Sequence, residues 1–287
     1  MTRFSLWLLR TFGALPLPVT RLIARMVAPL LYVIGRDRRL VAHANLALVF
    51  PDLSTRQRTQ LARGHFRAFT EALLDRGLIW WGSPERIRQK VRWINLHHYQ
   101  NAAKNHPVIL LAPHFVGLDA GGVLATMTWQ IVSIYSRQKN RLLDAAILAG
   151  RSRFNQPLLL SRQDGVRQAL RALGEHLPFY YLPDMDFGAK DAIFVPFFGV
   201  PAATVTAPAR LAALSGARIV PCVTRLTRNG YDVELYPAWD DFPGDDIAAA
   251  TLRVNQFIEE RVREMPEQYL WTHKRFKTRP PGAPKVY

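Results

Sequence analysis

The sequence has 287 residues, of which 49% are hydrophobic, so it can bury a sizeable core and is too apolar for a disordered chain. Its formal net charge of +16 predicts an attraction to polyanions such as nucleic acid, an anionic membrane surface or an acidic protein. The single cysteine, Cys222, excludes an internal disulfide and fits a reducing compartment.

The N-terminal stretch 4–35 is largely apolar but is interrupted by prolines and by three arginines, Arg10, Arg21 and Arg25. A cleaved signal peptide needs an uninterrupted apolar core, which Arg10 breaks. Residues 19–35 approach the length of a spanning helix, yet two of the arginines lie in their first half. A helix in the membrane interface, or a shallow hairpin, accommodates these arginines better, and an ordinary pair of core helices is the alternative.

Charge and position together predict how the chain is divided. Residues 1–40 carry seven arginines and one acidic residue, a balance that favours the cytoplasmic, anionic leaflet of a membrane. We therefore expect residues 1–40 to form a membrane anchor or interfacial helices. Residues 41–287 are expected to form one catalytic domain on the cytoplasmic side of the inner membrane.

The elements that follow alternate between strand and helix. Ser54 and Gln57 form a capping-box pattern that begins a helix running to about residue 79. Strands are expected at 107–113, 131–136 and 178–182, with helices at 117–129, 164–174, 207–216 and 251–265. Late in the chain, Asn229-Gly230 between two apolar runs predicts a hairpin. This order indicates an α/β fold with a mixed central sheet covered by helices.

His114 and Asp184 each follow a predicted strand. Ligands of such sheets bind off the carboxyl ends of strands, so these two residues are expected to share one cleft. Asp119 lies five positions after His114, about 140° away on a continuous helix. If His114 instead ends the strand and Asp119 begins the helix, the two side chains can meet, and the carboxylate can hold one imidazole nitrogen while the other acts as a base.

The H-x4-D pattern after an apolar strand resembles the motif of the glycerolipid acyltransferase superfamily. Three longer stretches narrow the resemblance to the late acyltransferases of lipid A biosynthesis, from about residue 42 to residue 282: NLALVFPDLS, YYLPDMDFGAKDAIFVPFFGVPAATVTAPARLAALSGARIVP and PEQYLWTHKRFKTRP. Many members of that family carry Glu at the position of Asp119, so the chain departs there while keeping a carboxylate.

The resemblance implies transfer of a fatty acyl chain from acyl carrier protein to a hydroxyl of a lipid A precursor, with no cofactor and no metal. His114 is then the general base, and Asp119 orients it. The resemblance also implies that Arg151 contacts an acceptor phosphate or the developing oxyanion, and that Asp184 holds Arg151 or another cation. A salt bridge that only organises the loop is the alternative for Arg151 and Asp184.

Other residues are weaker candidates. Phe197 and its neighbours Phe194 and Phe198 are candidates for an acyl-chain groove, with core packing as the alternative. Arg210 is expected to face the site from the helix at 207–216. Asp184 and Asp186 form a D-x-D spacing, but without further ligands they make a poor metal site.

Two alternatives to this reaction remain. The acceptor can be another anionic glycolipid or polar lipid, and an acyl-thioester hydrolase can use the same His and Asp. No G-x-S-x-G sequence occurs, which argues against an ester hydrolase of the α/β-hydrolase fold.

The basic tail 261–287 fits a membrane surface, lipid phosphate or acyl carrier protein, or is a solvated face. Nucleic-acid binding is not expected, because the aromatic residues fall mainly on apolar runs.

Overall fold

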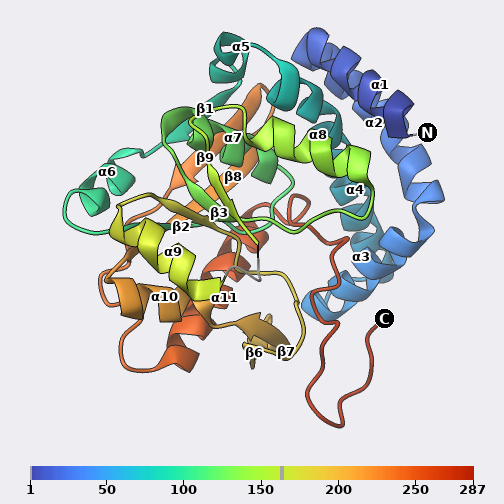
Figure 1. Cartoon of the computed structure of the whole chain (residues 1–287). Coiled ribbons are helices and arrows are strands. Elements are labelled where there is room, and N and C mark those ends of the chain that lie inside the picture. The colour runs from blue at the N-terminus through green and yellow to red at the C-terminus, as the bar shows by residue number, and fades with distance from the viewer. Residues whose placement is uncertain (1, 162–164) are drawn as a thin grey trace.

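The computed structural model describes residues 2–161 and 165–287, within which helices and strands alternate along most of the chain (Figure 1). The helices are α1 Thr2–Ala14, α2 Leu17–Ile34, α3 Arg36–Val49, α4 Thr55–Trp81, α5 Pro84–Arg88, α6 His97–Ala103, α7 Leu118–Thr128, α8 Arg141–Arg151, α9 Gly165–Gly174, α10 Ala207–Ser215 and α11 Ile247–Glu264. The strands are β1 Val91–Ile94, β2 Val108–Leu111, β3 Val132–Ile134, β4 Leu158–Leu160, β5 Phe179–Tyr181, β6 Ala192–Phe197, β7 Val200–Val205, β8 Arg218–Thr227 and β9 Gly230–Leu235.

Seven of the strands form one mixed sheet in the order β1-β9-β8-β2-β5-β3-β4. Its neighbours are parallel except β8 and β9, which form the hairpin predicted at Asn229-Gly230. The mixed central sheet covered by helices is therefore confirmed. Strands β6 and β7 form a separate two-stranded antiparallel arm that the sequence pattern did not predict.

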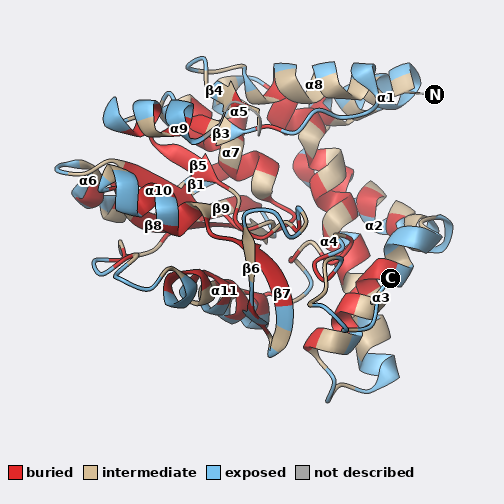
Figure 2. Cartoon of the chain, turned by 60° about the horizontal axis from the view of Figure 1, so that its bottom comes forward, coloured by how far each residue is buried: buried red, intermediate tan, exposed pale blue. Residues whose placement is uncertain are grey.

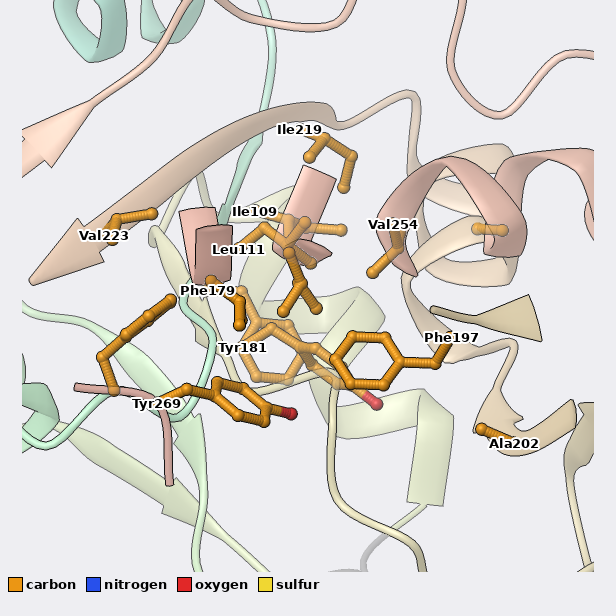
Figure 3. Packing of buried hydrophobic residues seen from close by; sticks show 14 of the residues in the cluster. Ile109, Leu111, Phe179, Tyr181, Phe197, Ala202, Ile219, Val223, Val254 and Tyr269 are labelled. Carbon is orange, nitrogen blue, oxygen red and sulfur yellow. The ribbon is translucent and has the colours of Figure 1, made fainter. Parts of the chain in front are cut away.

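The central strand β2 is buried on both faces and divides the core in two. Ile109 and Leu111 pack on one face with α10 and α11, and Figure 3 shows them beside the rings of Phe179 and Tyr181. Val108 and Leu110 pack on the other face with α7 and α4. Because successive side chains of a strand point to opposite faces, an unbroken apolar run is what such a position requires.

Local sequence signals explain several element boundaries. Ser54 accepts a hydrogen bond from the Gln57 backbone while Gln57 reaches back to Ser54, so the predicted capping box begins α4. Gly216, at φ 67°, ends α10 in the left-handed region, as expected of glycine there. The predicted helix at 164–174 is described from residue 165, since residue 164 lies outside the described residues. Strands β1 and β4 and helix α6 were not predicted, because such short segments give weak patterns. Helix α8 was not predicted either.

Helices α1 and α2 lie along α4 on one side of the molecule (Figure 1). The crossing of α1 and α4 is close, because a Cβ atom on Gly13 would lie 2.2 Å from the carbonyl oxygen of Gly77. Much of their outer surface is exposed, as the burial colours of Figure 2 illustrate. The exposed apolar face comprises nine large apolar residues of α1 and α2 together with Leu40 of α3: Phe4, Trp7, Leu8, Val19, Leu22, Met26, Leu30, Val33, Ile34 and Leu40. By length and composition α2 is able to cross a membrane, although 28% of it is buried in the protein.

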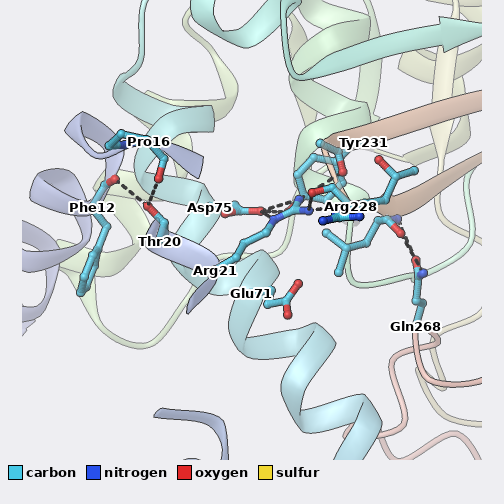
Figure 4. A network of polar contacts seen from close by, with 12 residues as sticks. Phe12, Pro16, Thr20, Arg21, Glu71, Asp75, Arg228, Tyr231 and Gln268 are labelled. Atoms are coloured by element: carbon cyan, nitrogen blue, oxygen red, sulfur yellow. Dashed lines mark hydrogen bonds and ion pairs between the residues drawn. The ribbon is translucent and has the colours of Figure 1, made fainter. Parts of the chain in front are cut away.

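A buried polar network fixes α2 to α4 and to the β8–β9 turn (Figure 4). Arg21 of α2 forms an ion pair with Asp75 of α4 at 3.1 Å, and both side chains are almost fully buried. Arg21 also donates to the backbone carbonyls of Thr227, Arg228 and Gly230 in the β8–β9 turn. The hydroxyl of Tyr231 donates to Asp75 at 2.7 Å. One arginine of the N-terminal stretch thus has a structural partner inside the protein.

Candidate active site

His114 lies just beyond the carboxyl end of β2, where the chain turns into α7. Its side chain is 14% exposed. The next strand in the sheet, β5, ends at Tyr181 and leads to Asp184, whose side chain is fully buried. The predicted common cleft at the carboxyl ends of these strands therefore brings His114 and Asp184 into direct contact.

Three hydrogen bonds join His114 to Asp184. The Nδ1 atom of His114 lies 2.7 Å from Oδ1 of Asp184, and the backbone N–H of His114 donates to both carboxylate oxygens at 3.2 and 3.0 Å. Burial opposes ionisation of Asp184, but the charge and hydrogen bonds of His114 hold the pKa of that carboxyl below its ordinary value. A carboxylate that binds Nδ1 leaves Nε2 as the imidazole nitrogen able to exchange protons.

Asp119, in the first turn of α7, binds two arginines. Nε of Arg76 on α4 donates to its Oδ2 at 2.6 Å, and Arg151 at the end of α8 donates to its Oδ1 at 2.8 and 2.6 Å. Burial opposes ionisation of Asp119, but the two guanidinium groups outweigh it and hold the pKa of Asp119 well below its ordinary value. Asp119 is an anion that organises two cations.

These contacts correct the expected pairing. Among the described residues no hydrogen bond or ion pair joins His114 to Asp119, and the prediction that Asp119 orients His114 is wrong for this arrangement. Asp184 binds His114 instead, and Asp119 takes the place expected of Asp184 as the partner of Arg151. The physical reason is that the first turn of α7 points Asp119 toward α4 and α8, where Arg76 and Arg151 lie. Arg76 itself was missed, because nothing in the α4 sequence distinguishes it from the other arginines there.

A largely apolar pocket adjoins Asp119 and Arg151. Its volume is about 50 Å³ and it opens to solvent. Gly122, Thr126 and Ile131 line it together with residues of β3, β4 and β5. The pocket places an apolar space directly beside a charged pair, an arrangement suited to a ligand with one polar and one apolar end.

The two adjacent glycines of α7 have different surroundings. A Cβ on Gly121 would lie 2.1 Å from Oγ1 of Thr224, so Gly121 allows α7 to pack closely on the sheet. A Cβ on Gly122 would meet only Tyr180 at 3.8 Å, and Gly122 lines the pocket. Close packing requires the first glycine, whereas the second leaves space for a ligand.

The tail segment, residues 266–278, lies along the His114 loop. The N–H of Leu270 donates to the carbonyl of His114 at 2.9 Å, and Val116 donates to the carbonyl of Gln268 at 2.8 Å. The tail segment is therefore part of the site rather than only a solvated basic face.

Asp186 ties the loop after β5 to the same tail segment. Its carboxylate accepts hydrogen bonds from Thr278, and its N–H donates to Nε2 of His273 at 3.1 Å. Burial and the nearby His114 lower the pKa of His273 to about 4. The described residues contain no group of three or more His, Cys, Asp or Glu able to hold a metal ion.

Two predicted substrate-binding residues lie away from these contacts. Phe197 is fully buried in the core, where its ring packs near Tyr269 (Figure 3). Its predicted place in an acyl-chain groove is wrong, and Phe194, at 38% exposed, is the accessible residue of that stretch. Arg210 is exposed on α10, and within the described part of the chain no hydrogen bond or ion pair joins it to His114 or Asp119.

Comparisons with known proteins identify close relatives of this chain. A family model described as bacterial lipid A biosynthesis acyltransferase matches residues 2–278. The chain is 30% identical to the lipid A biosynthesis palmitoleoyltransferase of Escherichia coli K12 over 100% of this chain and 94% of the relative. It is 32% identical to the lauroyltransferase of the same organism, over 93% and 91%. A solved structure, the 1-acyl-sn-glycerophosphate acyltransferase PlsC of Thermotoga maritima, covers 86% of this chain and 97% of its own at 12% identity and a TM-score of 0.37.

Proposed function

Because the chain belongs to the bacterial lipid A biosynthesis acyltransferase family, we propose that it moves a fatty acyl chain from acyl carrier protein to a hydroxyl of a lipid A precursor. The observation that carries the mechanism is the contact of Asp184 with His114, which lies five residues before Asp119, and Asp119 binds Arg151. The family establishes an acyltransferase of lipid A biosynthesis. The donor, the catalytic residues and the membrane geometry are our proposal.

In this mechanism Nε2 of His114 takes the proton of the acceptor hydroxyl as its oxygen attacks the thioester carbonyl. Asp184 holds Nδ1 and stabilises the imidazolium that forms. The tetrahedral intermediate then collapses, the carbon–sulfur bond breaks, and the imidazolium returns its proton to the leaving thiolate. The products are the acyl ester and the free thiol of the carrier protein, so atoms and charges balance.

Arg151 is the candidate for binding an anion at this centre. Its side chain is 37% exposed while Asp119 takes its Nε and Nη2 atoms, so the guanidinium is held in place with one edge available. A phosphate of the acceptor or the oxyanion of the intermediate fits such a fixed donor. In the proposal Arg76 and Asp119 orient Arg151 and do not touch the reacting atoms.

The apolar pocket beside Asp119 is proposed to hold the acyl chain. Gly122, Thr126, Ile131 and Ile134 offer an apolar lining to a hydrocarbon, and Asp119 and Arg151 line the same pocket with charge. In the proposal the thioester carbonyl lies near Arg151 and is reached by the acceptor hydroxyl that His114 deprotonates. No cofactor or metal takes part in this scheme.

The apolar outer face of α1 and α2 is proposed to lie in the cytoplasmic leaflet of the inner membrane. Nine large apolar side chains of these two helices are exposed, and exposed arginines such as Arg3 and Arg10 flank them. This orientation gives the catalytic domain access both to a lipid acceptor in the leaflet and to a soluble, acidic carrier protein.

The test is product analysis by mass spectrometry with purified acyl-acyl carrier protein, with and without a lipid A precursor. Native protein is expected to give the acylated lipid, and His114→Ala is expected to lower the rate by at least 100-fold with its melting temperature retained. Release of free fatty acid at the same rate without acceptor would indicate a thioester hydrolase. Transfer only to another polar lipid would reassign the acceptor. Near-native activity of His114→Ala would overturn the mechanism.

A further inference from the structure

A buried cation in the tail segment has no carboxylate partner of its own. The side chain of Arg275 is among the largest fully buried ones, with 1% of the residue exposed. Its guanidinium donates to the carbonyl of Ala203 at 2.9 Å, to Oγ1 of Thr204 at 2.9 Å and to Oδ1 of Asn255 at 3.2 Å. All three acceptors are neutral, and no ion pair of Arg275 occurs among the described residues.

An enclosed guanidinium is costly unless an opposite charge compensates it, and it cannot lose its proton. The hydroxyl of Tyr269 hydrogen-bonds to both Arg275 and Asp184, the partner of His114, and so joins the buried cation to the buried carboxylate. Arg275 also contributes to the low pKa of that carboxyl. Figure 3 shows the rings of Phe197 and Tyr269 in this part of the core, and the guanidinium of Arg275 lies 5.1 Å from the centre of the Phe197 ring. Water is thus excluded where the two charges interact, which strengthens their attraction.

We infer that Arg275 is a positioning residue that acts through Asp184 and holds that carboxylate ready to orient His114. This inference rests on the proposed function. Arg275 touches neither substrate nor His114. Its hydrogen bonds to β7 and α11 fix its place, and its charge reaches the pair across the protein interior. The tail segment accordingly supplies both the backbone contacts of His114 and the field around it.

Other charged and titratable groups face the same space and have to be separated from Arg275. On the tail segment they are His273 and Tyr269, on the loop after β5 Asp186, at the C-terminus Tyr287, and on α11 Glu259, which binds Arg263 and the N–H of Phe198. Burial raises the pKa of Tyr269 far above its ordinary value and lowers that of His273, so both are neutral near pH 7. Arg275 is then the cation whose removal changes the charge next to Asp184.

The experiment compares the pH dependence of kcat/KM in purified variants. Arg275→Gln removes the cation, so protonation of the His114–Asp184 pair becomes easier, and the acid limb is expected to move to higher pH by about 0.5–1 unit. Arg275→Lys keeps a charge and is expected to return the limb toward its native position. A lower activity at every pH with an unmoved limb in Arg275→Gln would overturn the inference and leave Arg275 a purely structural residue.

A second pair of variants leaves Arg275 in place and covers the case in which Arg275→Gln does not fold. Asn255→Asp sets a carboxylate against the guanidinium, neutralises its field, and is expected to move the acid limb in the same direction. Asn255→Leu loses the same amide donors without adding charge and is expected to keep the native limb. If the acid limb of kcat/KM lies at the same pH in these two variants, the inference is overturned. An active His114→Ala protein would instead refute the proposed function, so the two failures are distinguishable.

Discussion

The imidazole of His114 and the carboxylate of Asp184, 70 residues apart in the chain, are joined side chain to side chain and side chain to backbone. One carboxylate therefore fixes both the ring and the loop that carries it. This double contact makes Asp184 the residue on which the orientation of His114, the proposed base, depends.

Asp184→Asn is expected to lower kcat by about 10²–10⁴-fold, because an amide cannot stabilise the imidazolium that forms during proton transfer. The measurement is the steady-state rate of acyl transfer with both substrates saturating. Asp186→Asn is the matched control two residues away. It loses hydrogen bonds to Thr278 and is expected to lower the melting temperature while kcat stays within a few-fold. Equal kcat losses in both variants would contradict the assignment.

Asp119→Asn is expected to destabilise the protein by about 1–3 kcal/mol at pH 7, because two arginines lose their anion. The folded pKa of Asp119 lies below its unfolded value, so its contribution is complete above about pH 4 and is lost as the pH falls through the folded pKa. Urea unfolding between pH 7 and pH 3 is the measurement. The difference in free energy of unfolding between the native protein and Asp119→Asn should become smaller as the pH falls toward 3. A difference that does not change with pH would contradict this account.

Gly122→Leu and Gly121→Ala form a matched pair on α7. Gly122→Leu fills the pocket, so the preferred acyl chain is expected to shorten while the melting temperature changes little. Gly121→Ala collides with Thr224 and is expected to lower the melting temperature with no change in chain preference. The measurement is competition between acyl-acyl carrier proteins of different chain lengths. An unchanged preference in Gly122→Leu would exclude the pocket as the acyl-chain site.

The exposed face of α1 and α2 is tested with Trp7→Glu and Met26→Glu, whose native side chains are 60% and 73% exposed. Each is expected to weaken binding to vesicles containing anionic phospholipid by about ten-fold or more, since an apolar side chain leaves the bilayer and a negative charge replaces it. Leu214→Glu changes an equally exposed leucine on α10 and is expected to bind normally. Co-sedimentation measures all three, and normal binding of both N-terminal variants would place the membrane contact elsewhere.

Arg21→Met is expected to lower the free energy of unfolding by about 3–5 kcal/mol, because it leaves Asp75 buried without its cation. Burial already raises the pKa of Asp75, and loss of Arg21 raises it further. A raised carboxyl pKa favours the folded state at low pH and penalises it as the pH rises, so the deficit should be larger at pH 8 than at pH 5. Arg25→Met removes a half-exposed arginine of the same helix, and its partner Glu71 keeps its ion pair with Arg67. This variant is the control, and its free energy of unfolding in urea should fall by less than about 1 kcal/mol.

The location of the site could be predicted from the sequence more accurately than the side-chain contacts within it. His114 and Asp184 were expected in one cleft because both follow strands, and parallel strands end at one edge of a sheet. The partner of Asp119 could not be read from spacing, because its direction depends on Arg76 of α4 and Arg151 of α8, which pack against α7 only in the folded chain. The role of Asp186 and the tail segment was hidden for the same reason. Their contacts join segments about 90 residues apart.

Arg21 and Asp75 have a consequence for the reach of the enzyme. A buried ion pair holds helix α2 against α4. Helix α4 also carries Arg76, the partner of Asp119. The apolar outer face and the reacting centre therefore belong to one rigid body. When the exposed apolar face binds a surface, the height and tilt of His114 above that surface are fixed. In the proposed mechanism, an acceptor hydroxyl at another depth therefore has to move to His114.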